Sequence, residues 1–139
     1  MDNPWTVTYE SAPAEVQPWL VDLAHDRMRG RNRPVELMPV RDLEWILDLP
    51  LWWDDGHPFR LRPRDVLQQP ERNRAQHART NNADLAVPVD VAWYQGRWLV
   101  VDGVHRLLKA VSLGHTAVAV REVPASALVR FAGTTANAA

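Results

Sequence analysis

The chain has 139 residues, 46% of them hydrophobic and 24% charged, which is typical of one domain with its own core. Its 16 Lys and Arg residues nearly balance 17 Asp and Glu residues, so the net charge of −1 gives no general attraction to nucleic acid or acidic lipid. Cysteine is absent, which excludes disulfides, thiolate metal sites and thiol nucleophiles. The chain shows no secretory leader pattern and no apolar run of membrane-spanning length, so we expect a cytoplasmic protein with no membrane partner.

Hydrophobic periodicity marks the part of the chain that we expect to be ordered. Residues 1–13 contain two prolines and little periodicity, and the last residues are small and polar. We therefore expect a flexible N-terminus over 1–13, a single domain over 14–132 and a disordered tail over 133–139.

A first helix is predicted directly after Pro13. Apolar residues recur there at helical spacing, Pro18 is tolerated in the opening turn, and Gly30 ends the pattern. The stripe consists of Val16, Trp19, Leu20, Leu23 and Arg27.

Short elements follow in the first half of the chain. Residues 35–38 predict a strand, which Pro39 confines to an edge or an end of a sheet. Helical spacing returns over 43–47 and stops at Pro50. The stretch 51–58 combines two adjacent tryptophans with Asp-Gly and Pro turn residues, so we expect a loop with a buried aromatic anchor.

Residues 63–79 are dense in Arg, Gln and Asn. Pro70 divides this stretch into two short predicted helices. The second has no apolar stripe, so it is either solvated or lines a site.

The last third of the chain has the clearest pattern. Alternating valines from residue 87, a turn at Gln95-Gly96 and an apolar run over 98–101 predict a β-hairpin. Helical spacing over 104–111 and a strand over 118–123 follow. The order strand, turn, strand, helix, strand indicates a domain that contains both helices and strands.

The strongest chemical feature is the point where a predicted strand ends at Asp102-Gly103 and a helix begins. The first-turn amides of such a helix have no acceptor within it, so its N-terminus can bind an anion. Gly103 lets a phosphate approach, Arg106 offers a planar fork of donors, and His105 can donate a hydrogen bond or carry a proton. Asp102 could cap the helix or hold Mg²⁺ beside a nucleotide. The simpler interpretation, which stays open, is an ordinary turn and helix cap with the His105 and Arg106 side chains in solvent.

Residues 100–110 read Val-Val-Asp-Gly-Val-His-Arg-Leu-Leu-Lys-Ala, and Leu113-Gly114 closes the helix. This stretch resembles the ParB/sulfiredoxin superfamily, whose members carry a strand, then Gly-x-(His or Arg)-Arg, a helix ending in Leu-Gly and a last valine-rich strand. The resemblance covers residues 87–123 and extends weakly to 35–43. It implies an α/β fold of the α+β type with a small mixed sheet and flanking helices. It also implies nucleotide phosphates, from ATP, ADP or CTP, at Gly103, Val104, His105 and Arg106.

The departures from the family pattern narrow the expected chemistry. Val104 occupies the position of the catalytic cysteine in sulfiredoxins, which excludes sulfinic acid reduction. Partition proteins have a glutamate there, so CTP hydrolysis of their kind is in doubt. We also expect no clamping of DNA, because the chain is too short for the helix-turn-helix and dimerisation domains of those proteins.

Other candidate residues lie outside the motif. The family often brings a helix over the nucleotide, and the resemblance implies such a place for His77 and Arg79; a solvated polar helix is the alternative. Lys109 follows His105 by one helical turn and either reaches a phosphate or is a surface lysine.

The sequence thus favours a stand-alone domain that binds a nucleotide with Mg²⁺, or another phosphorylated small molecule. A phosphotransferase role stays open, with Asp102 and His105 as its catalytic residues and Asp84, Asp90 and Glu36 as more distant carboxylates. The alternative is a non-catalytic domain that contacts protein or DNA. DNA is not favoured, since acidic residues interrupt the arginine-rich stretches and no aromatic residues are interleaved with them. The sequence does not set the oligomeric state.

Overall fold

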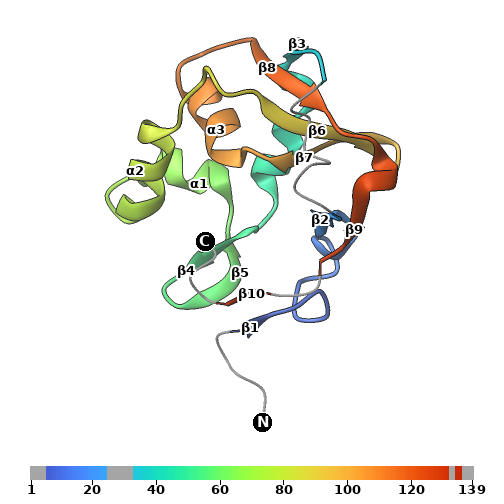
Figure 1. Cartoon of the computed structure of the whole chain (residues 1–139). Coiled ribbons are helices and arrows are strands. Elements are labelled where there is room, and N and C mark those ends of the chain that lie inside the picture. The colour runs from blue at the N-terminus through green and yellow to red at the C-terminus, as the bar shows by residue number, and fades with distance from the viewer. Residues whose placement is uncertain (1–5, 25–32, 132–133, 136–139) are drawn as a thin grey trace.

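The computed structural model describes residues 6–24, 33–131 and 134–135, and it has a mixed α+β fold around a four-stranded sheet (Figure 1). The strand order is β3-β8-β6-β7. β6 and β8 run parallel, whereas the two outer pairs are antiparallel, so the sheet is mixed. The strands are β3 (Glu36–Pro39), β6 (Val89–Tyr94), β7 (Arg97–Asp102) and β8 (Ala117–Glu122).

The predicted elements of the last third are confirmed. β6 and β7 form an antiparallel hairpin, and the positive φ of Gln95 and Gly96 matches the two-residue turn expected there. α3 (Val104–Ser112) leads from β7 to β8 and ends before Gly114, which also has a positive φ. Its apolar face is buried in the same core as the sheet, through Leu107, Leu108 and Ala110 with Val89, Val91, Leu99 and Val120.

The predicted helix after Pro13 is wrong within the described residues. A single 3₁₀ turn, η1 (Gln17–Trp19), is followed by β2 (Val21–Leu23), which pairs antiparallel with β9 (Leu128–Arg130). The chain leaves helical geometry at Leu20, and the hydrogen bonds that a helix would make locally are made instead to a strand more than a hundred residues away. Residues 25–30 of the predicted helix lie outside the described part.

Two further expectations are corrected in detail. The helical spacing over 43–47 falls mainly on a 3₁₀ helix, η4 (Glu44–Asp48), which follows a first 3₁₀ turn, η3 (Val40–Asp42). Both still bury apolar side chains. The expected loop over 51–58 is instead part of a hairpin of β4 (Trp52–Asp54) and β5 (His57–Leu61), and its Asp-Gly turn residues both have positive φ. The buried anchor is confirmed as Trp52, which is 8% exposed.

The two short helices around Pro70 are α1 (Pro63–Gln68) and α2 (Arg74–Asn82). Both pack against α3, and Figure 1 shows them on the same side of it. α2 lacks an apolar stripe, yet it buries Gln76 and Thr80 toward its neighbours. The Thr80 hydroxyl donates to the Gln76 carbonyl over 2.9 Å, so its polar group is satisfied inside the protein.

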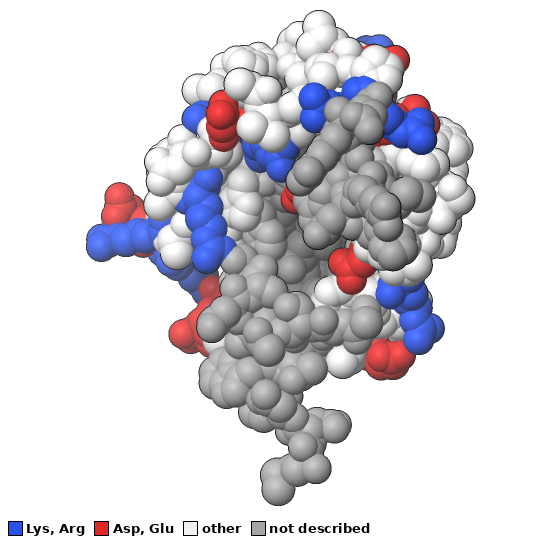
Figure 2. Space-filling view, viewed as in Figure 1, with Lys and Arg blue, Asp and Glu red and all other residues white. Residues whose placement is uncertain are grey.

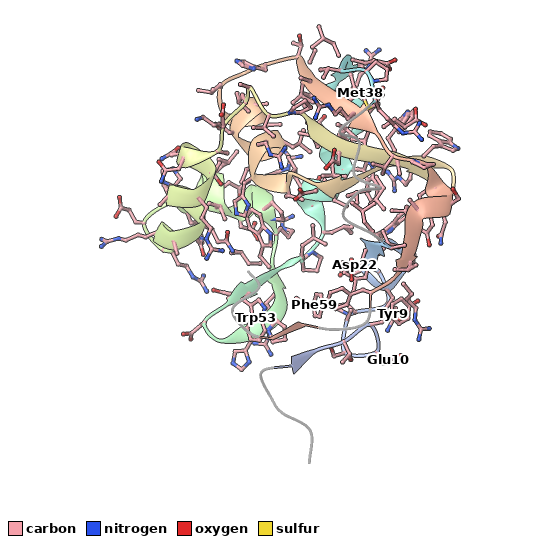
Figure 3. The ribbon with its side chains drawn as sticks, in the orientation of Figure 1. Tyr9, Glu10, Asp22, Met38, Trp53 and Phe59 are labelled. Atoms are coloured by element: carbon pink, nitrogen blue, oxygen red, sulfur yellow. The ribbon has the colours of Figure 1, made fainter. Side chains whose placement is uncertain are left out.

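The remaining elements lie away from the main sheet. β1 (Thr6–Val7) pairs with β10 (Thr134–Thr135), which places regular structure in parts of both terminal segments, and η5 (Ala125–Ala127) precedes β9. Figure 3 shows Tyr9 and Glu10 at the opposite end of the molecule from Met38 of β3. In the described part of the chain, no helix is long and apolar enough to span a bilayer.

Lys109 joins α2 to α3. Its Nζ donates to the carbonyl oxygens of Asn81 and Ala83, each over 2.8 Å. These carbonyls belong to the C-terminal end of α2, where backbone acceptors lack helical partners and a positive charge is favourable. The only lysine of the chain therefore stabilises a helix end.

We predict that Lys109→Met destabilises the protein by about 1–2 kcal/mol, because two carbonyls lose a charged donor. Urea unfolding measures the loss. Arg74→Ala is the control, since Arg74 pairs with Glu71 through side chains that are 83% and 87% exposed, and it should cost under about 0.5 kcal/mol. Equal losses in the two variants would contradict the role of Lys109.

Candidate functional site

A cavity of about 660 Å³ lies where β7 ends and α3 begins. Its walls come from the first turn of α3, the end of α2, the segment that leads to β6, and β4. The lining residues are Trp52, Arg79, Asn82, Ala83, Asp84, Val87, Val101, Asp102, Gly103, Val104, His105 and Arg106. The segment 102–106 and Arg79, all singled out by the sequence, thus meet at one cavity.

The backbone at the start of α3 has the geometry of a helix N-terminus. Gly103 is the N-cap residue with φ 113°, a conformation that side chains disfavour. The first intrahelical hydrogen bond runs from the Leu107 N–H to the Gly103 carbonyl over 3.0 Å. The amides of Val104, His105 and Arg106 precede it and have no acceptor within the helix, so this wall of the cavity favours an anion.

Arg106 connects the segments around the cavity. Its Nη1 group donates to the carbonyl oxygens of Pro88 and, over 3.4 Å, Val87, and its Nη2 atom lies 3.6 Å from the Asp102 carboxylate. The guanidinium also covers Gly103, since a Cβ there would lie only 3.1 Å from the Arg106 Cζ atom. The sequence predicted that the Arg106 guanidinium binds phosphate. In the structure, part of that guanidinium donates instead to the Val87 and Pro88 carbonyls.

His105 is held between two elements that are distant in sequence. Its ring stacks on Trp52 of β4, with centroids 4.6 Å apart and planes at 16°. Its Nε2 atom lies 2.7 Å from Oε1 of the buried Gln76 of α2. Burial, and then the positive charge of Arg79, lower the pKa of the His105 imidazole from its usual value. Both effects favour the neutral form of the ring.

The other candidates on α2 and α3 have different places. Arg79 is exposed and lines the cavity, and within the described residues it makes no hydrogen bond or ion pair. The Nδ1 atom of His77 lies 3.4 Å from the Asn81 side-chain nitrogen, and His77 is outside the lining. Lys109 is also outside the lining, because its ammonium group binds the end of α2.

The charges of the lining decide what kind of anion fits. The lining contains two arginines, Arg79 and Arg106, and two aspartates, Asp84 and Asp102. One Asp84 oxygen accepts a hydrogen bond from the Ala86 amide over 2.9 Å. Among the described residues no group of three His, Cys, Asp or Glu side chains could hold a metal by itself. Mg²⁺ usually takes one or two carboxylates together with phosphate oxygens, so Asp84 and Asp102 fit a metal that arrives with a phosphate ligand.

Several arginines of the arginine-rich stretches form ion pairs with acidic residues, so they do not make a continuous basic surface. Figure 2 shows basic and acidic side chains intermingled on the described part of the visible face. The pairs are Arg62–Asp65, Arg64–Asp48, Arg72–Asp54 and Arg74–Glu71. Arginines 27, 29 and 31 lie outside the described residues.

Sequence reasoning missed part of this site. Trp52 was expected only as a core anchor, and Asp84 only as a distant carboxylate. Gln76, Asn82 and Val87 gave no signal of a place in the site.

A scan of protein-family models and searches of curated proteins and solved structures found no match to this chain. The geometry of the chain itself is therefore the basis for a functional proposal.

We predict that Gly103→Ala destabilises the protein by more than about 1 kcal/mol, because the new methyl group adds a contact with Arg106 to the strain of a positive φ. In an Arg106→Ala background the loss should fall by at least about 0.5 kcal/mol. Unfolding free energies of the four proteins in the cycle give this coupling.

Gly114→Ala is the matched control for this cycle. Gly114 has φ +77°, and a methyl group added there would have no neighbour within 4 Å, so its loss should be the same with or without Arg106. A zero coupling for Gly103 would contradict the close packing of the guanidinium on the glycine.

We predict that His105 titrates below its usual value and that Arg79→Gln raises its pKa without restoring the usual value, since burial is the larger cause. In the unfolded chain the histidine has a pKa of about 6.5, so it binds a proton more tightly than His105 does in the folded protein. The contribution of the neutral ring to stability is thus full above that pH and is lost as pH falls through the folded pKa. NMR titration measures the shift, with Arg74→Gln as the control that should leave it unchanged.

Proposed function

We propose that the chain is a ParB/sulfiredoxin-like domain of the cytoplasm that binds a nucleotide, or another phosphorylated small molecule, together with Mg²⁺. The observation that carries the proposal is that the segment 102–106 forms one wall of a cavity of about 660 Å³ at a helix N-terminus. This is the segment on which the family resemblance depends. The cavity volume lies in the range typical of small-molecule sites.

The phosphate group would bind to the start of α3. The amides of Val104, His105 and Arg106 point along the helix axis toward an anion, where the helix dipole adds to the attraction. Arg79 enters the cavity from α2 and supplies a charge that no described residue neutralises through an ion pair. Arg106 would act indirectly, because its guanidinium holds Asp102 and the Val87 and Pro88 backbone in place.

The two aspartates support a metal complex rather than a bare anion. The charges of Asp84 and Asp102 offset those of the two arginines, so the side chains of the cavity have no net positive charge to attract a free phosphate. These two carboxylates would hold Mg²⁺, which would supply positive charge for the phosphate group. Asp102 is thus the first protein ligand that we assign to the metal.

A phosphotransferase role rests on the same residues. Phosphoryl transfer depends mainly on positioning and on electrostatic stabilisation, which the helix N-terminus, Arg79 and a bound Mg²⁺ would supply. Asp102 is the carboxylate adjacent to the motif and can hold the metal or orient a hydroxyl acceptor. Binding without transfer is the simpler form of the proposal, and it is tested first.

We predict that ATP, ADP or CTP binds with Mg²⁺ and binds more weakly without it, as measured by titration calorimetry. Arg79→Ala should weaken the binding about 10- to 150-fold, the range for losing a hydrogen bond to a charged group. Arg74→Ala on the same helix is the control, because that side chain is 83% exposed and outside the cavity lining.

Two outcomes would contradict the proposal. The first is that none of the three nucleotides, nor inorganic phosphate with Mg²⁺, binds to the protein. That result would favour the non-catalytic interaction domain. The second is that Arg79→Ala binds the nucleotide as tightly as the control Arg74→Ala and the unmodified protein do, which would place the ligand elsewhere.

A further inference from the structure

His105 makes a contact for which the sequence holds no signal. Gln76 lies on α2, is 7% exposed, and places its side-chain Oε1 atom 2.7 Å from the His105 Nε2 atom. Stacking on Trp52 fixes the plane of the ring. The imidazole therefore has one orientation and one defined protein partner.

The contact decides which ring nitrogen carries the proton. An amide oxygen accepts hydrogen bonds and cannot donate them, so Nε2 must be the protonated nitrogen. In a neutral ring the other nitrogen, Nδ1, then has a lone pair and acts as an acceptor. Within the described residues, Nδ1 of His105 has no hydrogen-bond partner.

Charged groups of both signs line the cavity together with this ring. Arg79 comes from α2, Asp84 from the segment after α2, Asp102 from the end of β7, and Arg106 from α3 itself. The ring stacks on the apolar surface of Trp52. Burial, and then the positive charge of Arg79, lower the pKa of the imidazole and so disfavour a proton on its second nitrogen. Both effects favour the neutral ring over an imidazolium that donates to phosphate.

We propose that Gln76 is a positioning residue that holds His105 as the tautomer with the proton on Nε2, so that Nδ1 accepts a hydrogen bond from the bound ligand. The ligand class is thereby narrowed. It is a phosphorylated compound that carries a hydrogen-bond donor beside its phosphate, either a hydroxyl group or a protonated phosphate oxygen. The assignment of the ligand rests on the function proposed above, whereas the tautomer does not.

This inference differs from the role suggested by the sequence, in which His105 could donate to the ligand. Here the donor of the ring is directed to Gln76, and the ligand meets the acceptor. A hydroxyl group held by Nδ1 could pass its proton to that nitrogen, leaving the electron pair on oxygen. His105 would then be the proton acceptor of the site, and Asp102 would be available for Mg²⁺.

The tautomer can be measured on the protein without any ligand. In a long-range ¹H–¹⁵N NMR spectrum at pH 7.5, the two ring nitrogens of His105 give different patterns when only one is protonated. We expect Nε2 to be protonated and Nδ1 to be unprotonated. A proton on Nδ1, or a mixture of the two forms, would overturn the proposal whether or not a nucleotide binds.

Two variants test whether Gln76 is the cause. Gln76→Glu places a carboxylate at the same distance and should raise the pKa of His105, with protons on both nitrogens near pH 7. Thr80→Val is the matched control, because it removes a buried hydrogen bond on the same helix that does not involve His105. It should lower stability and leave the His105 signals unchanged. An unchanged spectrum in Gln76→Glu would overturn the role of Gln76.

The ligand arm uses Mg²⁺ with ATP, ADP and CTP. A nucleotide that donates to Nδ1 stabilises the neutral ring, so the pKa of His105 should fall when it binds. A rise would show that the ligand accepts from an imidazolium, and would overturn the proposal. If no nucleotide binds, the proposed function fails on its own, and the tautomer of the free protein still decides this inference.

Discussion

The guanidinium of Arg106 lies on the backbone of Gly103, and the arrangement of the whole site depends on this contact. The glycine has no side chain, so the arginine can reach the Val87 and Pro88 carbonyls while it stays within 3.6 Å of Asp102. The continuous segment from the end of β7 to the start of α3 is thereby connected to the approach to β6, which it meets only in the folded protein. The same contact orients the wall of the cavity that we assign to phosphate.

The polar character of α2 is explained by its position between solvent and this site. Its inner side carries Gln76, whose Oε1 atom contacts the His105 ring, and Thr80, whose hydroxyl group donates to a backbone carbonyl. Its C-terminal end is bound by Lys109 of α3. A helix that packs through hydrogen bonds needs no apolar stripe. The bonds at Gln76, Thr80 and Ala83 are partly or wholly buried, so they are costly to remove. α2 thus stays in place as one wall of the cavity and presents Arg79 to it.

The last third of the fold could be predicted because its signals are local. Alternating valines, a Gln-Gly turn and the apolar face of α3 each determine a neighbouring element. The predicted helix after Pro13 failed because Val21–Leu23 take their hydrogen bonds from Leu128–Arg130, a pairing that leaves no mark in the local pattern. The β4–β5 hairpin was missed for a related reason, since its strands are short and Phe59 interrupts the regular strand with φ 55°.

The candidate site shows the same division. Asp102, Gly103, His105 and Arg106 are contiguous and could be found from residue types at the start of a helix. Arg79 was placed by resemblance, and His77, which was placed with it, lies outside the cavity lining. Trp52 and Gln76 are brought to His105 by β4 and α2, and their contribution depends on tertiary packing alone. Only the folded chain shows that the histidine ring lies against a protein amide.

The most direct test of the account is to follow the backbone amides of α3 while Mg²⁺ and each nucleotide are added. In ¹H–¹⁵N spectra, we expect the amide signals of Val104, His105 and Arg106 to shift the most and to saturate together with the signal of the Arg79 side chain. Binding that shifts other amides and leaves these three unchanged would contradict the claim that the N-terminus of α3 holds the phosphate.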